Sequence, residues 1–136
     1  ILCNRISFGT TKINLFSVHL STYQDERILA AKEINRIMKK IDSNELIIMG
    51  GDFNVGVTRL GKGKYTFEKA ETYEEYEILK KQLEQLPNKK DTWFSELGKG
   101  CIDTIFYSKG IRLNKYETIN VNGVSDHDAV FAEFDI

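Results

Sequence analysis

Apolar and polar positions along the first half of the chain follow the periods of strands and helices in turn. Residues 1–8 and 12–20 are typical of two strands joined by a short turn that contains glycine. An apolar stripe at three- and four-residue steps across residues 28–41 predicts a helix. The apolar run within residues 45–50 predicts a short buried strand. Strand, helix and strand in this order indicate a crossover unit.

The second half is less regular. Residues 55–72 show little periodicity and contain three glycines, which predicts a long loop. A helical stripe predicts a second helix over residues 73–86, and residues 91–94 suggest a short irregular or helical piece. Three final strands are expected at residues 101–108, 113–121 and 129–136. The last of them alternates cleanly between apolar and polar positions, so one of its faces should be buried.

Composition sets limits on this picture. The chain has 136 residues, enough for one domain with a hydrophobic core. No apolar run approaches the ~20 residues that a membrane-spanning helix needs, so no membrane span is expected. The net charge of -1 offers none of the basic footprint that duplex-binding domains often carry. A phosphate substrate stays compatible with it, because a metal ion can supply positive charge.

Polar residues that end or interrupt the predicted strands supply the candidate chemistry. One histidine ends the second strand, an acid and an amide follow the buried strand, another acid lies in the fourth apolar run, and an Asp-His pair precedes the last strand. In chain order they are His19, Asp52, Asn54, Asp103, Asp126 and His127. Polar groups in such places usually line one edge of a sheet, so the pattern predicts a hydrolytic site there.

Asp52 and Asn54 have two interpretations that the sequence leaves open. Gly, Asp and Asn are the usual residues of a turn after a strand, which explains the segment without any function. In extended backbone, however, residues two apart share one face, and both side chains would then point into a site. The aspartate can orient and deprotonate a water there. The asparagine can donate to a phosphate oxygen or place the acid.

His127 is the stronger of the two histidine candidates. Asp103 interrupts an apolar run, and a buried carboxylate needs a partner, which His127 can provide as imidazolium. A histidine held in this way can stabilise charge on a phosphorane or act as a general acid or base. Asp126 can bind a hard cation such as Mg²⁺. A polar loop before an edge strand explains the same segment, and a structural role explains His19.

The order of these motifs resembles the endonuclease/exonuclease/phosphatase superfamily. His-Leu at a strand end, Gly-Asp-Phe-Asn, Ile-Asp-Thr-Ile-Phe and Ser-Asp-His follow one another between about residues 12 and 136. The superfamily includes deoxyribonucleases, exonuclease-III-type enzymes, sphingomyelinases and phosphatases, so the resemblance leaves the substrate open. It implies an α+β fold, part of a four-layer α/β/β/α sandwich to which this chain contributes mainly one mixed sheet and its covering helices.

The resemblance also implies a reaction, the in-line hydrolysis of a phosphoester by an activated water. Asp52 would position or activate that water, and Asn54 and His19 would bind the phosphate. His127, oriented by Asp103, would stabilise the pentacovalent phosphate. The implied enzyme is a Mg²⁺-dependent phosphoric ester hydrolase. The alternative is a binding or scaffold module that keeps the fold and has lost catalysis.

The chain departs from the superfamily pattern at its beginning. Domains of the superfamily are about twice as long, and their first half supplies an Asn and the Glu that anchors the metal. We therefore expect residues 1–136 to be the C-terminal portion of one such domain, with the N-terminal half missing and the metal site incomplete. Asp126 would lie at the Mg²⁺ (or Mn²⁺) ion. On its own, the chain is expected to be weakly active or silent.

Partners and compartment follow less directly. The expected partner is a phosphoester substrate, with nucleic acid among the candidates. Some aromatic side chains could stack on bases, but core packing explains them more simply. One sheet face would lack its usual cover, which predicts self-association through that face. The two cysteines, Cys3 and Cys101, fit no zinc spacing, which favours a reducing compartment such as the cytoplasm.

Overall fold

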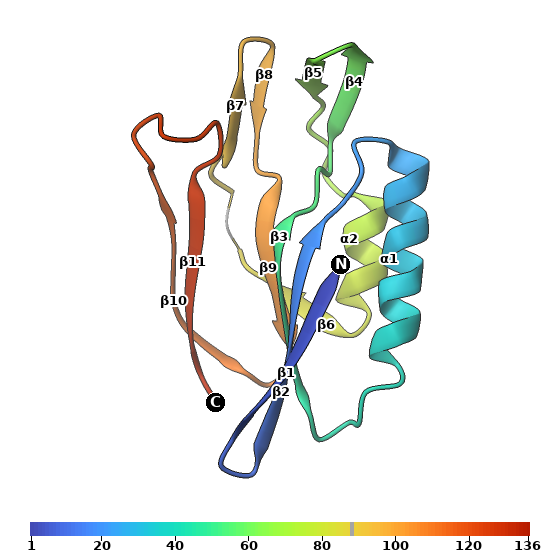
Figure 1. Cartoon of the computed structure of the whole chain (residues 1–136), viewed down its shortest axis with the longest axis vertical. Helices are drawn as coiled ribbons and strands as arrows, with labels where there is room; N and C mark the ends of the chain where they lie inside the picture. The colour runs from blue at the N-terminus through green and yellow to red at the C-terminus, as the bar shows by residue number, and fades with distance from the viewer. Residues whose placement is uncertain (88) are drawn as a thin grey trace.

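A five-stranded mixed sheet forms the centre of the computed structural model, which describes residues 1–87 and 89–136 (Figure 1). In spatial order its strands are β1 (Leu2–Phe8), β2 (Thr11–His19), β3 (Leu46–Asp52), β9 (Asp103–Ser108) and β6 (Leu83–Gln85). β2 and β3 pair in parallel, and the other neighbours pair antiparallel. The parallel pair confirms the predicted crossover unit, and the mixture of sheet and helices confirms the α+β class.

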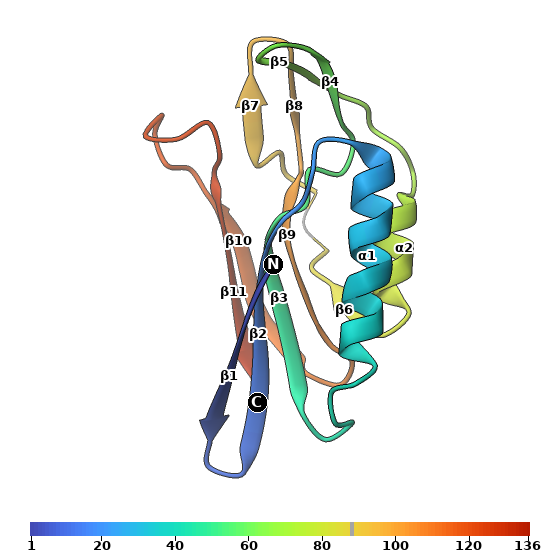
Figure 2. The ribbon, with the colours of Figure 1, turned by 45° about the vertical axis from the view of Figure 1, so that its right-hand side comes forward.

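Two helices cover one face of this sheet, as Figure 2 shows. They are α1 (Gln24–Met38) and α2 (Glu74–Lys80). The apolar stripe of α1 is buried as predicted, and Ile34 has no exposed surface at all. It packs in one core cluster with Phe16 of β2, Met49 of β3 and Leu79 of α2. Full burial of a side chain such as Ile34 contributes about 1.5–3 kcal/mol.

An antiparallel ribbon of two strands lies on the opposite face, next to β9 (Figure 2). It consists of β10 (Arg112–Ile119) and β11 (Ala129–Asp135). The predicted alternation of the last strand is confirmed, because Val130, Ala132 and Phe134 turn toward the sheet. The ring of Phe134 lies 4.9 Å from that of Tyr107, measured between centroids. The sheet is thus sandwiched between helices and a β-ribbon.

Two hairpins replace segments for which the sequence predicted a loop and an irregular or helical piece. β4 (Val57–Gly61) pairs with β5 (Lys64–Phe67), and β7 (Trp93–Ser95) pairs with β8 (Gly98–Gly100). Both project beyond the end of the central sheet (Figure 1). The ring of Phe67 lies so close to Gly100 that a Cβ there would be 2.3 Å away. Strands this short are stabilised by such contacts between hairpins, and local periodicity cannot reveal them.

The predicted second helix over residues 73–86 is too long. α2 ends at Lys80, and the chain continues as β6, which pairs with β9. Leu83 and Leu86 fit the helical stripe, yet Leu83 lies in β6 and packs in the core beneath the helices, and Leu86 packs with Tyr107 of β9. Apolar residues at these positions are compatible both with a longer helix and with a strand after α2. Pairing with the edge of β9 favours the strand.

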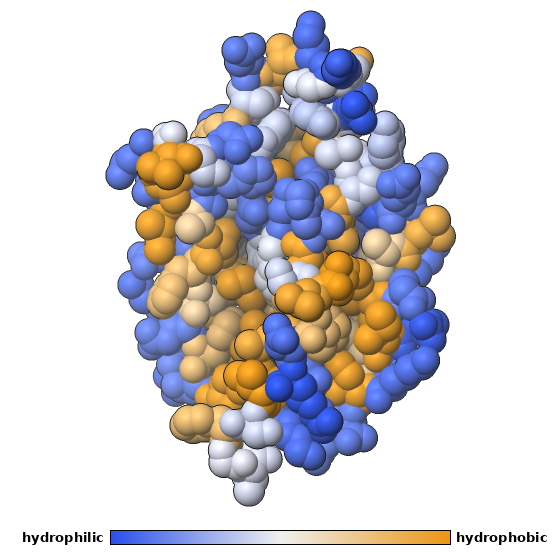
Figure 3. All heavy atoms as spheres, in the orientation of Figure 1, coloured by the Kyte–Doolittle hydropathy of each residue, from blue (hydrophilic) through white to orange (hydrophobic). Residues whose placement is uncertain are grey.

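Apolar side chains remain exposed on β1, at the edge of the sheet. All seven residues of this strand are exposed, and Leu2 and Phe8 retain 61 % and 79 % of their surface. Figure 3 shows apolar side chains gathered across this part of the molecule. Self-association through this face stays a prediction. Among the described residues, no helix has the length and apolar character needed to cross a membrane.

Candidate active site

Three of the candidate residues form a row across adjacent strands. His19 of β2 pairs in register with Asp52 of β3, and Asp52 pairs in turn with Asp103 of β9. Side chains of directly paired residues point to the same face of a sheet. The helix side is occupied by Phe16, Val18 and their neighbours, so the row faces the β10–β11 side. The predicted gathering of these polar groups at one end of the sheet is therefore confirmed.

A glycine permits the close strand pairing on which this row depends. Gly51 precedes Asp52 and has a φ of 144°, a backbone conformation that other residues rarely adopt. A Cβ at this position would lie only 2.0 Å from the carbonyl oxygen of Val18. Gly51 thus lets β2 approach β3 closely enough to bring His19 opposite Asp52.

Asn54 holds the carboxylate of Asp52 in place. The backbone N–H of Asn54 donates to Oδ1 of Asp52 at 2.8 Å, and its Nδ2 donates to Oδ2 at 3.1 Å. The same amide donates to the carbonyl of Leu20 at 2.9 Å. The two side chains meet through a left-handed backbone at Asn54, with a φ of 50°, so the turn is the interpretation that describes this segment. These contacts show Asn54 placing the acid, and its contact with a phosphate stays a prediction.

Asp52 lies between two histidines and a second acid. Nε2 of His19 is 3.5 Å from Oδ2 of Asp52, with the His19 side chain 79 % exposed. Burial raises the pKa of Asp52; the backbone hydrogen bond from Asn54 opposes this effect, and the charge of Asp103 adds to it. Within this chain, the parallel register between β2 and β3 supplies Asp52 as the partner of His19.

His127 is paired with Asp103, as the sequence predicted. Nδ1 of the imidazole lies 2.9 Å from Oδ2 of Asp103. Burial lowers the pKa of His127, but the hydrogen bond and charge of Asp103, together with Asp52 and Asp126, outweigh it and raise the pKa above its ordinary value. This shift favours the imidazolium form more than in an ordinary exposed histidine. With Nδ1 engaged, Nε2 is the nitrogen available to a substrate.

Thr92 connects the two halves of this pair and was missed in the sequence. Its hydroxyl, with no exposed surface, accepts the backbone N–H groups of Ile102 and Asp103 at 3.1 and 3.0 Å. Its carbonyl accepts the N–H of Asp128 at 2.7 Å, beside His127. Thr92 therefore positions both Asp103 and the His127 segment. A lone threonine in an aperiodic segment carries no motif, and only the folded chain identifies it.

A buried ion pair supports the loops around the row. Nε of Arg27 lies 2.8 Å from Oε1 of Glu75, with the two side chains 4 % and 1 % exposed. Nη1 of Arg27 also donates to the carbonyls of Ser21 and Val57, at 3.3 Å each. These carbonyls follow His19 and Asn54 in the chain. Arg27 thus joins α1, α2 and the start of the β4–β5 hairpin behind the site.

One predicted metal ligand, Asp126, lies in the described part of the chain. Among the described residues, no three His, Cys, Asp or Glu side chains form a group that could hold a metal ion. Asp126 is exposed and offers a hard oxygen donor next to His127. Its carbonyl accepts the N–H of Phe94 at 2.9 Å, which fixes its backbone. The described residues do not by themselves complete a metal site, so Asp126 as a ligand and Mg²⁺ or Mn²⁺ as cofactor stay predictions.

Comparison with known structures shows the same fold in several proteins. Two structures of D. rerio TDP2 are similar: a humanized form (TM-score 0.74, 16 % identity) and a complex with a single-stranded DNA product (0.73, 14 %). They match 98 % of this chain, which spans 59 % and 60 % of theirs. The endonuclease domain of TRAS1, a telomere-specific non-LTR retrotransposon, has a TM-score of 0.69 at 18 % identity, with 99 % and 63 % covered.

A phosphatase also shares the fold. Mannosyl-6-phosphatase Bt3783 of Bacteroides thetaiotaomicron VPI-5482 has a TM-score of 0.65 at 19 % identity, with 94 % of this chain and 53 % of that one covered. No match was found among curated proteins. The sequence model of a family described as endonuclease-reverse transcriptase matches residues 13–131. The chain therefore belongs to this family, within the endonuclease/exonuclease/phosphatase superfamily.

Proposed function

We propose that the protein hydrolyses a phosphoester bond at the row formed by His19, Asp52 and Asp103. The observation that carries the proposal is the register, which places these three side chains on neighbouring strands with His127 paired to Asp103. Acids and histidines in contact at the end of a sheet can activate a water and stabilise charge on phosphate. Burial raises the pKa of Asp52, and the hydrogen bond and charge of Asp103 outweigh burial to raise that of His127; both directions suit this chemistry.

Asp52 is the proposed group that orients and deprotonates the attacking water. Its raised pKa makes the carboxylate a stronger base than an exposed aspartate, and the hydrogen bonds from Asn54 fix its direction. His127, held as imidazolium by Asp103, would donate from Nε2 to the phosphate oxygens as negative charge develops. His19, exposed beside Asp52, is placed to bind the phosphate or to protonate the leaving group.

A divalent metal ion is part of the proposal, although none of these steps depends on it. Mg²⁺ or Mn²⁺ would supply Lewis-acid stabilisation of the phosphate when bound. Asp126 is the residue of this chain proposed to contact it, because its exposed carboxylate lies beside His127. The other ligands are not supplied by a cluster of His, Cys, Asp or Glu among the described residues.

Nucleic acid is the first substrate class to test. The similar structures include one complexed with single-stranded DNA and one described as an endonuclease domain, as well as a sugar phosphatase. The net charge of -1 does not favour a long duplex. Single-stranded or structured nucleic acid therefore comes before duplex, with phosphomonoesters as the second class.

Turnover on a substrate panel tests the proposal. The full-length protein would be assayed on single-stranded DNA, duplex DNA, RNA, a sugar phosphate and bis(p-nitrophenyl) phosphate, with Mg²⁺ and with EDTA. The Asp52→Ala variant serves as the blank, because it removes the proposed base. Hydrolysis that the variant lacks supports the proposal. Equal hydrolysis by both proteins, or none by the wild type on any substrate, favours a binding or scaffold module.

A further inference from the structure

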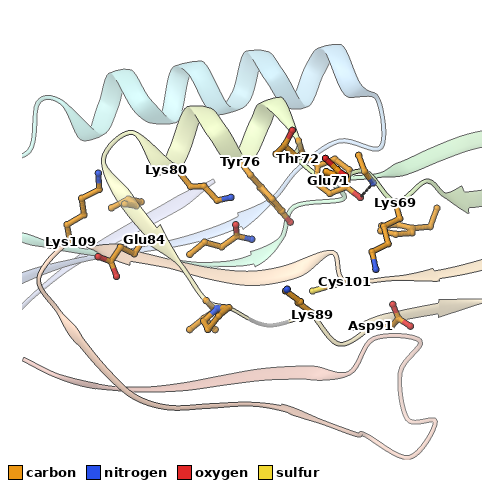
Figure 4. A pocket seen from close by; sticks show the side chains of 17 residues that line it. Lys69, Glu71, Thr72, Tyr76, Lys80, Glu84, Lys89, Asp91, Cys101 and Lys109 are labelled. Atoms are coloured by element: carbon orange, nitrogen blue, oxygen red, sulfur yellow. Dashed lines mark hydrogen bonds between the residues drawn. The ribbon is translucent and has the colours of Figure 1, made fainter.

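A hollow lies on the helix side of the sheet. It is a cavity of about 800 Å³ between α2, β6 and the segment that leads to β7 (Figure 4). Its volume falls within the ~300–1,000 Å³ typical of small-molecule sites. Apolar and aromatic side chains form much of its wall, among them Phe67, Tyr73, Leu83 and Pro87. A flat apolar group of a ligand would find van der Waals contacts there.

The hydroxyl of Tyr76 is the unusual polar group of this wall. The side chain extends from α2 toward the cavity (Figure 4) and is 6 % exposed. Among the described residues, its oxygen has no hydrogen-bond partner. Burial raises the pKa of Tyr76 well above its ordinary value, so the hydroxyl stays protonated and is a donor. A buried donor without an acceptor is costly, and an acceptor on a ligand would remove that cost.

Neighbouring aromatic rings hold the ring of Tyr76 in place and so fix the direction of its hydroxyl. Its centroid lies 5.8 Å from that of Phe53 and 5.5 Å from that of Phe106, both in edge-to-face geometry. Tyr73 packs against its other side at 5.8 Å. Three aromatic contacts leave the ring little freedom to turn toward another acceptor.

Lysines outnumber acids around the cavity. Its lysines are Lys69, Lys80, Lys89 and Lys109, and its acids are Glu71, Glu84 and Asp91. The charge of Asp91 is offset by Lys99, which lies 3.1 Å away. An anionic group on a ligand would therefore meet a small excess of positive charge.

Two of these lysines approach the cavity from different sides. Figure 4 shows Lys80 extending from α2 and Lys89 from the segment that follows β6. Lys80 also contacts Glu77 at 3.1 Å, in a pair whose side chains are 41 % and 53 % exposed. Exposed pairs of this kind are worth only about 0–1 kcal/mol, so Lys80 can exchange Glu77 for a ligand anion at little cost.

We propose that this cavity is a second binding site, for an aromatic phosphate of nucleotide size. The ring system would rest on the apolar wall at Leu83 and Pro87, and the phosphate would lie between Lys80 and Lys89. An acceptor atom of the ligand would take the hydrogen bond of the Tyr76 hydroxyl. Apolar wall, oriented donor and cationic rim together match a ligand that is flat at one end and anionic at the other.

Asp52 does not line the cavity, although Tyr76 in the cavity wall interacts electrostatically with Asp52 and Asp103. The row faces the β10–β11 side, and the cavity opens beside α2. Phe53, which packs on Tyr76, is nevertheless the residue directly after Asp52. Replacing the carboxylate of Asp52 removes the proposed catalytic base and leaves the cavity wall intact.

Calorimetric titration of the full-length Asp52→Asn protein tests the second site without consuming the probe. 1-Naphthyl phosphate and adenosine diphosphate are the aromatic probes, and inorganic phosphate is the control. We expect both aromatic probes to bind at least tenfold more tightly than inorganic phosphate. Tyr76→Phe should weaken them about three- to tenfold, and Lys89→Ala about tenfold or more. Lys39→Ala, which removes an exposed lysine beyond α1, should change nothing.

Each outcome decides the proposal. It is overturned if neither aromatic probe binds at 1 mM, if inorganic phosphate binds as tightly, or if Tyr76→Phe and Lys89→Ala match Lys39→Ala. Binding to the wild type that Asp52→Asn abolishes would place the probe at the row and overturns it too. Since Tyr76→Phe removes only a hydroxyl, the variant should fold. If Tyr76→Phe is more stable than the wild type and binds the probes equally well, Tyr76 is an ordinary buried tyrosine and the proposal is overturned.

Discussion

Alanine substitution at two adjacent glycines, Gly50 and Gly51, should have different effects on the strand pairing that forms the row. A Cβ at Gly51 would lie 2.0 Å from the carbonyl oxygen of Val18, whereas real Cβ contacts are essentially never under 3.0 Å. The obstacle is backbone, so β2 and β3 would have to separate by about 1 Å. At Gly50 the nearest atom is Cγ1 of Ile105 at 3.3 Å, part of a side chain that can rotate. Gly51→Ala should therefore damage the site and Gly50→Ala should not.

The expected cost of Gly51→Ala follows from two effects. Alanine at a φ of 144° is strained by about 1–3 kcal/mol, and overpacking against Val18 adds about 1–3 kcal/mol. The total of about 2–6 kcal/mol is a large share of the about 5–15 kcal/mol that stabilises a typical domain. Gly50→Ala should stay within about 1 kcal/mol of the wild type, because its backbone is not in the left-handed region.

Urea unfolding followed by the fluorescence of Trp93 measures both variants. Trp93 is buried at 6 % exposure and is the single tryptophan, so its emission reports loss of the fold near the row. We expect a much lower midpoint for Gly51→Ala, or failure to fold, and an almost unchanged midpoint for Gly50→Ala. Equal midpoints for the two variants would refute the close approach of β2 to β3 at Gly51.

Three further variants probe the acids, the histidine and their support. Asp103→Asn should lower the pKa of His127, since the hydrogen bond and charge of Asp103 overcome the effect of burial. An NMR titration of the imidazole measures this pKa. The alkaline limb of the pH–rate profile should move to lower pH, and an unmoved limb would contradict the pairing. Asp52→Asn should keep or raise stability at pH 7 while lowering kcat/KM about 10²-fold or more. Burial raises the folded-state pKa of Asp52, so its contribution to stability is present at acid pH and is lost as the pH rises through that pKa; a urea midpoint clearly below the wild type at pH 7 would count against this reasoning. Thr92→Ala should lower the free energy of unfolding by about 1–3 kcal/mol, because it leaves two buried N–H groups without an acceptor, and it should also reduce activity. Thr92→Ser should restore stability and activity, as measured in unfolding and turnover assays. Failure of serine to restore them would show that the methyl group matters more than the hydroxyl.

The strands that carry the row were predictable because each is marked by its own residues. Val18, Met49 and Phe106 lie in apolar runs that are buried against the helices. The polar residues at the ends of these runs stand out for that reason, and His19 and Asp52 were found in this way. The pairing of Asp103 with His127 was predictable for a different reason, since a carboxylate inside an apolar run needs a partner.

Other parts of the site depend on contacts that no local pattern reports. In the β7–β8 hairpin, Gly100 packs closely against Phe67, which is far away in the sequence. The partner of His19 is set by the register between two parallel strands, and register is a property of the pair. Thr92 acts through its hydroxyl on the backbone of β9, a contact without a sequence signature. These features depend on tertiary contacts, which the local sequence pattern does not report.

The ratio kcat/KM for the best phosphoester substrate, measured for the wild type and for Asp52→Asn and His127→Gln in the full-length protein, tests the central claim most directly. We predict that each substitution lowers kcat/KM by about 10²-fold or more, because each removes a proton-transfer or charge-stabilising group of the row. Lys39→Ala, outside the row, should retain the wild-type value. Undiminished kcat/KM in Asp52→Asn or His127→Gln would contradict the claim that this row performs the hydrolysis.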